Sequence, residues 1–151
     1  MPTPTTRSDF GYAWLALCIA LGAHVADEAL TNFLGVYNPT VLAMRARYPW
    51  FPMPTFGFRE WLIGLIAACV LLLLLTPFAF QPDSAGGRLL RPGAYFFAVI
   101  MLFNGLGHTV FTIFGQTVSL VHFARPAPGF YSSPLLLAAS IYLLWRLRAS
   151  R

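Results

Sequence analysis

Four long apolar stretches constrain the fold of this chain more than any other feature of its sequence. A helix needs about 20 predominantly apolar residues to cross the hydrocarbon core of a bilayer. Each stretch approaches or exceeds that length, and together they occupy more than half of the chain. Little sequence is left for a second domain, so we expect a single all-α domain over residues 1–151, a four-helix transmembrane bundle. The expected spans are residues 11–34, 56–80, 93–116 and 130–147.

The composition agrees with a membrane protein. The 151 residues are 58% hydrophobic and only 10% charged, with a mean hydropathy of +0.66, whereas soluble domains carry about 25% charged residues. All ten basic residues are arginines, and the lack of lysine excludes chemistry through a lysine Schiff base, including that of retinal proteins. The first stretch is too long for the apolar core of a cleaved signal peptide, and no small-x-small site follows it. We therefore interpret it as a retained span.

The arginines favour one orientation in the membrane. Cytoplasmic loops of membrane proteins are enriched in Lys and Arg. Six arginines fall at the two chain ends and in the connection at residues 81–92, and four fall on the opposite side. This difference favours both termini in the cytoplasm. Arginines scattered over both sides fit anionic lipid headgroups better than nucleic acid, so membrane lipids are expected partners and nucleic acid is not. Assembly into a homo-oligomer stays open.

The connection between the first two spans, "YNPTVLAMRARYPWFPMPT", is too apolar for a plain linker. Asn38 followed by Pro39 is typical of a helix start. The helix is expected to run to about Arg47, because three prolines follow it. We interpret this segment as a short interfacial helix that lies over the outer mouth of the bundle. Before the last span, "RPAPGFYSSP" indicates a rigid turn in which Ser132 or Ser133 caps the next helix.

Ionisable residues interrupt the expected spans, and such residues inside a membrane mark a functional site by default. His24 and Glu28 are four residues apart and therefore share one face of the first helix, with Asp27 at the edge of that face. Asn104 and His108 have the same spacing on the third helix. Each helix thus carries a polar stripe on one side. Gly105 and Gly107, which flank the second stripe, are expected to let the third helix approach the first closely.

A further carboxylate, Glu60, lies one turn inside the outer end of the second span. At a rise of about 1.5 Å per residue, Glu60 falls about 6 Å, Glu28 about 9 Å and His108 about 12 Å below the outer ends of their spans. Three helices thus place polar residues at a similar depth, and the sequence predicts one cluster in the outer half of the membrane. Exposure of Glu60 to the headgroups is the alternative, and His122 in the outer loop is expected to face solvent.

Two imidazoles and several carboxylates form a nitrogen and oxygen ligand set typical of zinc, iron or manganese. Inward-facing Glu and His residues also build the metal sites of helical bundles. Asn104 would serve as a further ligand, bind substrate or orient His108, and Glu28 or Asp27 would transfer protons. A metal-free hydrogen-bonded network with a protonated carboxyl group is the alternative. The ligands predicted for one or two divalent ions are His24, Glu28, Glu60 and His108.

The segments "HVADE", "NGLGH" and "PAPGFYSSP" resemble the HXXEE-domain family of small bacterial integral membrane proteins. That family is named for a His-x-x-Glu-Glu motif and has a downstream Asn/His helix and a Pro-Gly turn before its last helix. The resemblance covers nearly the whole chain but departs at Asp27, which stands where the family has its first glutamate. The shorter side chain weakens Asp27 as a direct metal ligand. The resemblance implies a bacterial inner-membrane protein and implies little about activity.

Three functions are compatible with these features, and the sequence favours the first. It is a membrane-embedded metal-dependent enzyme that acts on a lipid or another apolar small molecule, by hydrolysis or by oxidation. The second is a small transporter or proton-coupled carrier that uses the same buried His and Glu residues, although the sequence lacks the internal repeat from which many carriers are built. The third is a metal-free partner subunit whose polar network holds the helices together.

Overall fold

The computed structural model describes residues 5–149, which form six helices and one short β-hairpin. The strands β1 (Gln116–Val118) and β2 (Val121–His122) pair antiparallel. The all-α prediction is confirmed for the described residues, apart from this hairpin, which the sequence did not predict. The helices are α1 (Thr5–Leu30), α2 (Leu34–Arg47), α3 (Phe58–Leu74), α4 (Thr76–Ala79), α5 (Ala85–Phe114) and α6 (Ser133–Ala149).

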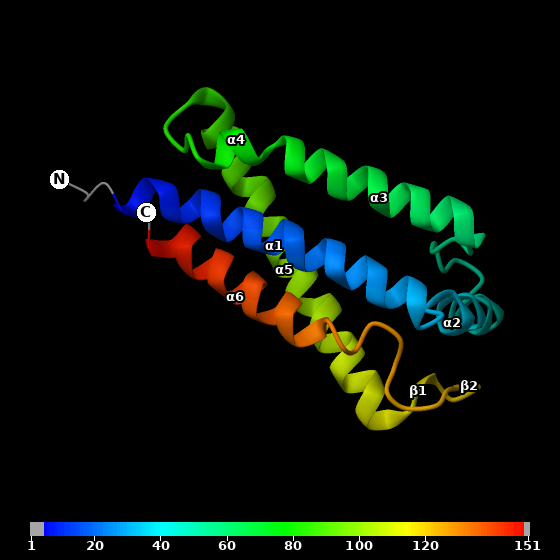
Figure 1. Ribbon diagram of the computed structural model, residues 1–151. Helices are drawn as coiled ribbons and strands as arrows, with labels where there is room; N and C mark the ends of the chain where they lie inside the picture. The colour runs from blue at the N-terminus through cyan, green and yellow to red at the C-terminus, as the bar shows by residue number, and fades with distance from the viewer. Residues whose placement is uncertain (1–4, 150–151) are drawn as a thin grey trace.

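The long helices lie side by side, with α1 between α3 and α6 and with α5 packed along α6 (Figure 1). Helix α1 begins and α6 ends at one end of the bundle, whereas α2 and the β-hairpin lie at the opposite end (Figure 1). The last turns of α1 lead into α2, and the last turns of α5 lead into the hairpin. The polar stripes of α1 and α5 therefore both approach this second end.

The apolar core is centred on α1. Trp14 and Leu17 of α1 are buried against Leu136 and Leu143 of α6 within one core cluster. The indole nitrogen of Trp14 donates a hydrogen bond to the backbone oxygen of Leu72 in α3 at 3.2 Å. This bond gives the buried indole N–H the partner that it needs away from water. This packing fixes α1 against both of its neighbours and thereby fixes the direction in which its polar residues point.

Two of the helices are long and apolar enough to cross a membrane: Asp9–Leu30 within α1, and α5. Helices α3 and α6 have 17 residues each, or about 25 Å at 1.5 Å per residue, against about 30 Å of hydrocarbon. Helix length and composition within residues 5–149 therefore support two spans, and the predicted four-span bundle is not supported.

The first apolar stretch ends earlier than predicted. It was expected to continue to residue 34, but α1 stops at Leu30, and Asn32 has a left-handed backbone with φ of 59°. Asparagine tolerates this conformation better than most residues, so it allows a sharp turn. The predicted short helix between the first two apolar stretches is present as α2 and ends at Arg47, but it begins at Leu34 rather than at Asn38 and contains Pro39.

The third apolar stretch also has a different start. The sequence predicted a polar connection at residues 81–92 and a helix from residue 93, whereas α5 begins at Ala85 and contains Pro92. The Ser84 hydroxyl accepts a hydrogen bond from the Gly87 amide at 3.0 Å and caps the helix. Hydropathy detects the membrane-like part of a helix and misses a polar first turn, which is why this boundary was wrong.

Candidate metal centre

The buried face of α1 carries two polar residues of the candidate site. Leu17 and Leu21 lie in the core, and the same face continues at helical spacing to His24 and Glu28. His24 is 1% exposed and Glu28 is 5% exposed. Both side chains are therefore almost entirely shielded from solvent, and both need partners inside the protein.

Helix α5 provides the second histidine. His108 is 7% exposed, and its Nε2 lies 3.1 Å from Oε1 of Glu28. The same carboxylate oxygen lies 3.4 Å from Nε2 of His24, and the two imidazole rings are 4.7 Å apart in an edge-to-face arrangement. One ligand atom from each of the three residues lies within 4.8 Å of the others. The predicted meeting of the first and third apolar stretches is therefore present.

A glycine of α5 makes this meeting possible, although not as the sequence predicted. We expected Gly105 and Gly107 to bring α5 close to the first helix. Instead, Gly105 packs on α6, where an added Cβ would lie 2.9 Å from Cγ of Leu137 and 3.3 Å from the backbone oxygen of Ser133. Small residues allow such close helix approach. Helix α6 thus sets the position of α5, and His108 reaches Glu28 as a result.

Asn104 lies one turn before His108 and contacts the other histidine. Its Oδ1 is 3.1 Å from Nε2 of His24. Three roles were predicted for Asn104: metal ligand, substrate binding or orientation of His108. The structure places its side chain against His24 instead of His108. The carboxamide oxygen of Asn104 and Oε1 of Glu28 therefore both lie next to Nε2 of His24.

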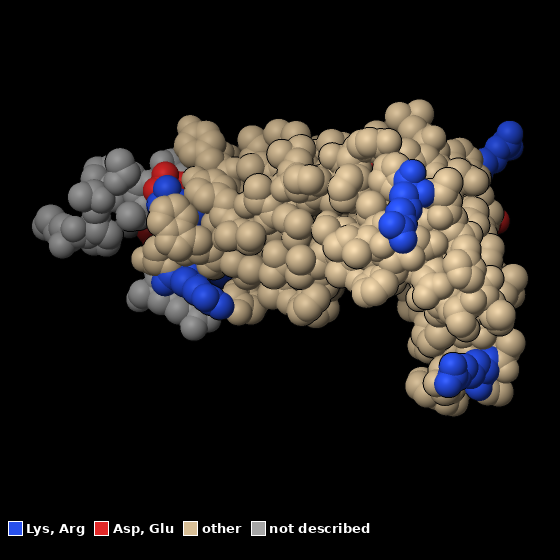
Figure 2. Space-filling view, turned by 90° about the horizontal axis from the view of Figure 1, so that it is seen from below, with Lys and Arg blue, Asp and Glu red and all other residues tan. Residues whose placement is uncertain are grey.

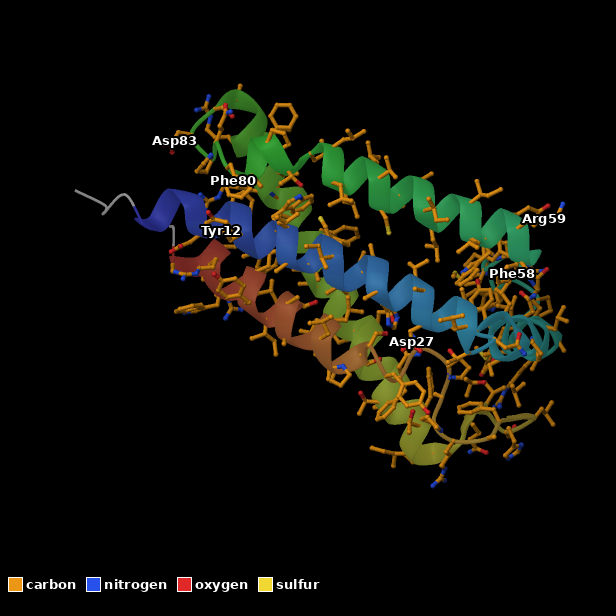
Figure 3. All side chains as sticks on the ribbon, viewed as in Figure 1. Tyr12, Asp27, Phe58, Arg59, Phe80 and Asp83 are labelled. Atoms are coloured by element: carbon orange, nitrogen blue, oxygen red, sulfur yellow. The ribbon has the colours of Figure 1, made fainter. Side chains whose placement is uncertain are left out.

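A hydrogen-bonded chain behind His24 was not predicted. Ser132 lies in the turn before α6, and its Oγ is 2.8 Å from Nδ1 of His24 and 2.8 Å from Oδ2 of Asp27. The Ser132 amide donates to the same Asp27 oxygen at 2.8 Å. Asp27 leaves the side of α1 near this turn (Figure 3), so it anchors the start of α6 rather than facing the two histidines directly.

This hydrogen-bonded chain favours one tautomer of His24. A serine hydroxyl has one proton, and an ionised Asp27 is the strongest acceptor beside it. If Ser132 donates to Asp27, its oxygen accepts from Nδ1–H of His24. The neutral imidazole then keeps a lone pair on Nε2, the atom that faces Glu28 and Asn104. Carboxylates that orient metal-binding histidines through the second ring nitrogen have the same effect.

The resulting arrangement fits a cation. The Nε2 lone pair of His24 faces a carboxylate oxygen and a carboxamide oxygen, all three of which attract positive charge. Ligand atoms on a tetrahedral zinc ion with bonds of 2.0–2.1 Å are about 3.3 Å apart, close to the 3.1 and 3.4 Å that separate Oε1 of Glu28 from the two histidine nitrogens. The whole set lies within 4.8 Å, so the histidines would close slightly around an ion. Two histidines and one carboxylate also form known catalytic zinc and non-haem iron ligand sets. Without a metal, a hydrogen on Nε2 of His24 that donates to Asn104 or Glu28 would satisfy the same contacts.

The turn before α6 covers the cluster at a glycine. Gly129 has φ of +80°, and an added Cβ would lie 2.8 Å from Cε1 of His108 and 2.9 Å from Cγ of Glu28. The Gly129 amide donates to Oγ1 of Thr31 at 3.0 Å. Only glycine combines this backbone conformation with such close contact. The Pro-Gly turn noted in the sequence is therefore one wall of the candidate site.

Glu60 does not belong to the cluster, contrary to the predicted ligand set. It is exposed, and its Oε2 accepts a hydrogen bond from the Gly57 amide at 3.2 Å, which caps the start of α3. Its neighbours Phe58 and Arg59 mark this helix end in Figure 3. The alternative, in which Glu60 faces outward, describes the structure. His122 is exposed, as expected.

A cavity of about 620 Å³ adjoins the cluster, between α2, α5, the β-hairpin and the segment after it. Of the cluster residues, Glu28, Asn104 and His108 contribute to its wall, and the rest of the wall is mostly aromatic or aliphatic. Tyr37 of α2 also lines it. Burial raises the pKa of Tyr37, and the nearby Arg45 guanidinium opposes that change. An apolar cavity with a few convergent polar groups is typical of a small-molecule site.

Comparisons of the chain with protein families, with curated proteins and with solved structures found no match. The resemblance to the HXXEE-domain family therefore stays a prediction, and the candidate function rests on the geometry of the cluster and the cavity.

Proposed function

We propose that this protein is a membrane-embedded metal-dependent enzyme that acts on a lipid or another apolar small molecule. The observation that carries the proposal is the meeting of His24, Glu28 and His108 in a buried group beside a cavity. One ion, zinc, iron or manganese, fits better than two, because only one carboxylate lies among the three ligands. Catalytic metal sites commonly have three protein ligands and an open position.

The surface supports the membrane part of the proposal. Arginines gather toward the ends of the long axis, and the middle of the face in Figure 2 shows no charged residue. Large apolar side chains are exposed on α5, and also on the shorter helices: Phe96, Phe103, Ile63, Ile66, Leu135 and Ile141. Exposed apolar surface of this extent is unusual for a soluble monomer. We infer that α3 and α6 lie in the bilayer beside α1 and α5, in an inner membrane with both termini in the cytoplasm.

The residues of the cluster divide into distinct roles. A divalent ion held by the two histidines and Glu28 would polarise a carbonyl oxygen, lower the pKa of water or, as iron, support oxidation. Glu28 reaches the cavity wall and is therefore the carboxylate in position to transfer a proton. Asp27 is bound to Ser132, so we assign it a positioning role instead of the predicted catalytic one.

Metal analysis of the purified full-length protein tests the proposal. We expect about one ion per chain in the wild type and its loss in His24→Ala and His108→Ala, because two-ligand sites bind metal weakly. His122→Ala is a matched control, since this exposed histidine lies outside the cluster, and it should leave the metal content unchanged. Helical circular dichroism shows whether each variant is folded. Unchanged metal content in both cluster variants would exclude the metal centre.

A proton-coupled carrier is the second candidate. A continuous path of short contacts connects Glu28 at the cavity through His24 and Ser132 to the half-buried Asp27. Such chains can relay protons through a membrane protein. Proton flux into liposomes separates the two functions: a carrier moves protons without bound metal, and Ser132→Ala stops the flux. The enzyme proposal expects no such flux.

A further inference from the structure

The open side of the cavity lies along one face of α5. Three of its lining residues are exposed, Ile100 (42%), Phe103 (67%) and Phe111 (37%), and all three are apolar residues of α5. The lining residues contributed by α2 and by the hairpin are half-buried or buried. Helix α5 is one of the two helices long and apolar enough to span a membrane. In the membrane placement proposed above, an opening on this face would lead into the hydrocarbon rather than into water.

The charges of the wall restrict the kind of molecule that fits. None of the described lining residues is an arginine, and Glu28 is the one carboxylate among them. The nearest guanidinium of α2, that of Arg45, donates to the backbone oxygen of Met53 at 2.6 Å. The hydroxyls of Thr40 and Thr117 lie 2.5 Å apart and bond each other. A phosphate or a free carboxylate on a ligand would therefore find no arginine among the described wall residues. The one positive charge beside it would be that of the proposed ion, which Glu28 already neutralises in part, and burying an unpaired charge is costly.

We propose that the cavity binds a single-chain amphiphile with an uncharged polar end, such as a long-chain alcohol, aldehyde, amide or ester. The polar end lies at Asn104, Glu28 and His108, and the chain extends past Phe103 into the bilayer. The volume of about 620 Å³ lies within the range of about 300–1,000 Å³ typical of small-ligand sites, which suits one chain and not a two-chain phospholipid. The role of this molecule as substrate rests on the proposed function, whereas its binding requires only the cavity.

Gly107 provides a way to fill the cavity without disturbing the helix. It lines the cavity, and the nearest atom to an added Cβ is Cε2 of Phe111 at 3.8 Å. Gly93 lies on the same helix outside the cavity, and an added Cβ there meets nothing within 4 Å. Gly107→Phe and Gly93→Phe therefore make the same substitution in the same helix, and only the first occupies the proposed binding site.

Photolabelling of the full-length protein in lipid nanodiscs tests the proposal. The probe is a long-chain alcohol with a diazirine on its chain, and labelled peptides are identified by mass spectrometry. We expect labelling in α2 and α5, unchanged labelling of Gly93→Phe, and a loss of about tenfold in Gly107→Phe, since removal of the site costs at least about 1.4 kcal/mol. Equal labelling of the two variants overturns the proposal. If Gly107→Phe does not fold, Gly107→Leu and Gly93→Leu replace the pair.

Competition tests the uncharged end. An unlabelled alcohol of equal chain length should displace the probe at about tenfold lower concentration than the corresponding alkyl phosphate. Equal or better competition by the phosphate overturns the assignment. Labelling is measured with and without a chelator. If metal analysis finds no ion but labelling persists with the chelator, the cavity binds the amphiphile and only the metal centre is excluded. If an ion is present but labelling does not depend on Gly107, only the lipid site is excluded.

Discussion

The two ends of α1 are both joined to neighbouring helices by charged side chains, but in opposite environments. At the first end, Asp9 lies 2.9 Å from Arg146 of α6, and both side chains are 25% exposed. At the second end, the Glu28 side chain is 6% exposed and lies within 3.1 and 3.4 Å of two histidines. Water solvates the first pair in part and is almost absent from the second group.

This difference in solvent exposure indicates which of the two groups has a role beyond stability. Ion pairs that water partly solvates near the surface contribute about 0–1 kcal/mol and can be lost at little cost. A buried charged group must recover a desolvation penalty of several kcal/mol per ion, and well-packed apolar residues would often replace it without loss. The Glu28 group is costly to bury and lies beside a cavity, so it is a candidate functional site. The Asp9–Arg146 pair is accounted for by the contact that it makes between α1 and α6.

Glu28→Ala is expected to have the largest effect on the buried group at the second end of α1. It removes the carboxylate shared by His24 and His108, so both imidazoles lose a partner in the protein interior. We expect the free energy of unfolding to fall by about 3–5 kcal/mol and metal binding to be lost. Chemical denaturation and metal analysis measure the two effects. Glu60→Ala is the control, because this exposed carboxylate only caps α3; equal losses in both variants would contradict the distinction between the two environments.

Gly129→Ala tests the packing around the same group without removing a polar atom. The added methyl group meets His108 and Glu28 at under 3 Å, on a backbone with positive φ. We expect a loss of about 2–3 kcal/mol in stability and weaker metal binding, because His108 must move. Gly22→Ala on α1, where an added Cβ meets nothing within 4 Å, should be neutral or slightly stabilising. Normal metal affinity in Gly129→Ala would show that His108 is not held by this turn.

Ser132→Ala sharpens the comparison by separating orientation from stability. Loss of the hydroxyl frees Nδ1 of His24 from its partner, and we expect metal affinity to fall by about 10–100-fold, as for other residues that orient ligands. Ser140→Ala is a matched control: Ser140 is a buried serine of α6, and its hydroxyl donates to the Leu136 backbone oxygen at 2.7 Å. Both variants should lose about 1 kcal/mol of stability.

Only Ser132→Ala should change metal affinity, and Ser132→Thr should restore part of it because threonine keeps the hydroxyl. Nitrogen-15 chemical shifts of the His24 ring report which nitrogen carries the proton. An unchanged protonation pattern together with unchanged affinity in Ser132→Ala would refute the role of this chain.

The residues that meet within one helix could be predicted from the sequence, because helical geometry is local. Spacing of four residues placed His24 with Glu28 and Asn104 with His108, and the structure brings these two pairs together. Ser132 could not be found in this way, since its contact with His24 depends on the path of a turn more than 100 residues later in the chain. The available signal was the Pro-Gly turn itself, which indicated a rigid segment but not its neighbours.

The errors have equally physical causes. The predicted depth in the membrane put Glu60 level with the other carboxylates, but depth does not tell where a side chain points. In the structure the Glu60 side chain turns back to the Gly57 amide at the start of α3. Hydropathy identified the apolar stretches and not the ends of the helices, so the polar start of α5 at Ala85 was missed. The β-hairpin has strands of two and three residues, too short for an alternating pattern to be visible.

Asp9→Asn is expected to have the smallest effect, because it changes the partly exposed ion pair at the first end of α1. It removes the charge that pairs with Arg146, while the Arg146 guanidinium keeps its position 4.5 Å above the Trp145 ring. We expect a loss of at most about 1 kcal/mol, measured by denaturation at low salt, and a smaller loss at high salt because exposed charges are screened. Metal content should not change. If Asp9→Asn instead destabilised the protein as much as Glu28→Ala, exposure would not distinguish the two ends of α1, and the cost of burial would no longer single out the Glu28 cluster as the functional one.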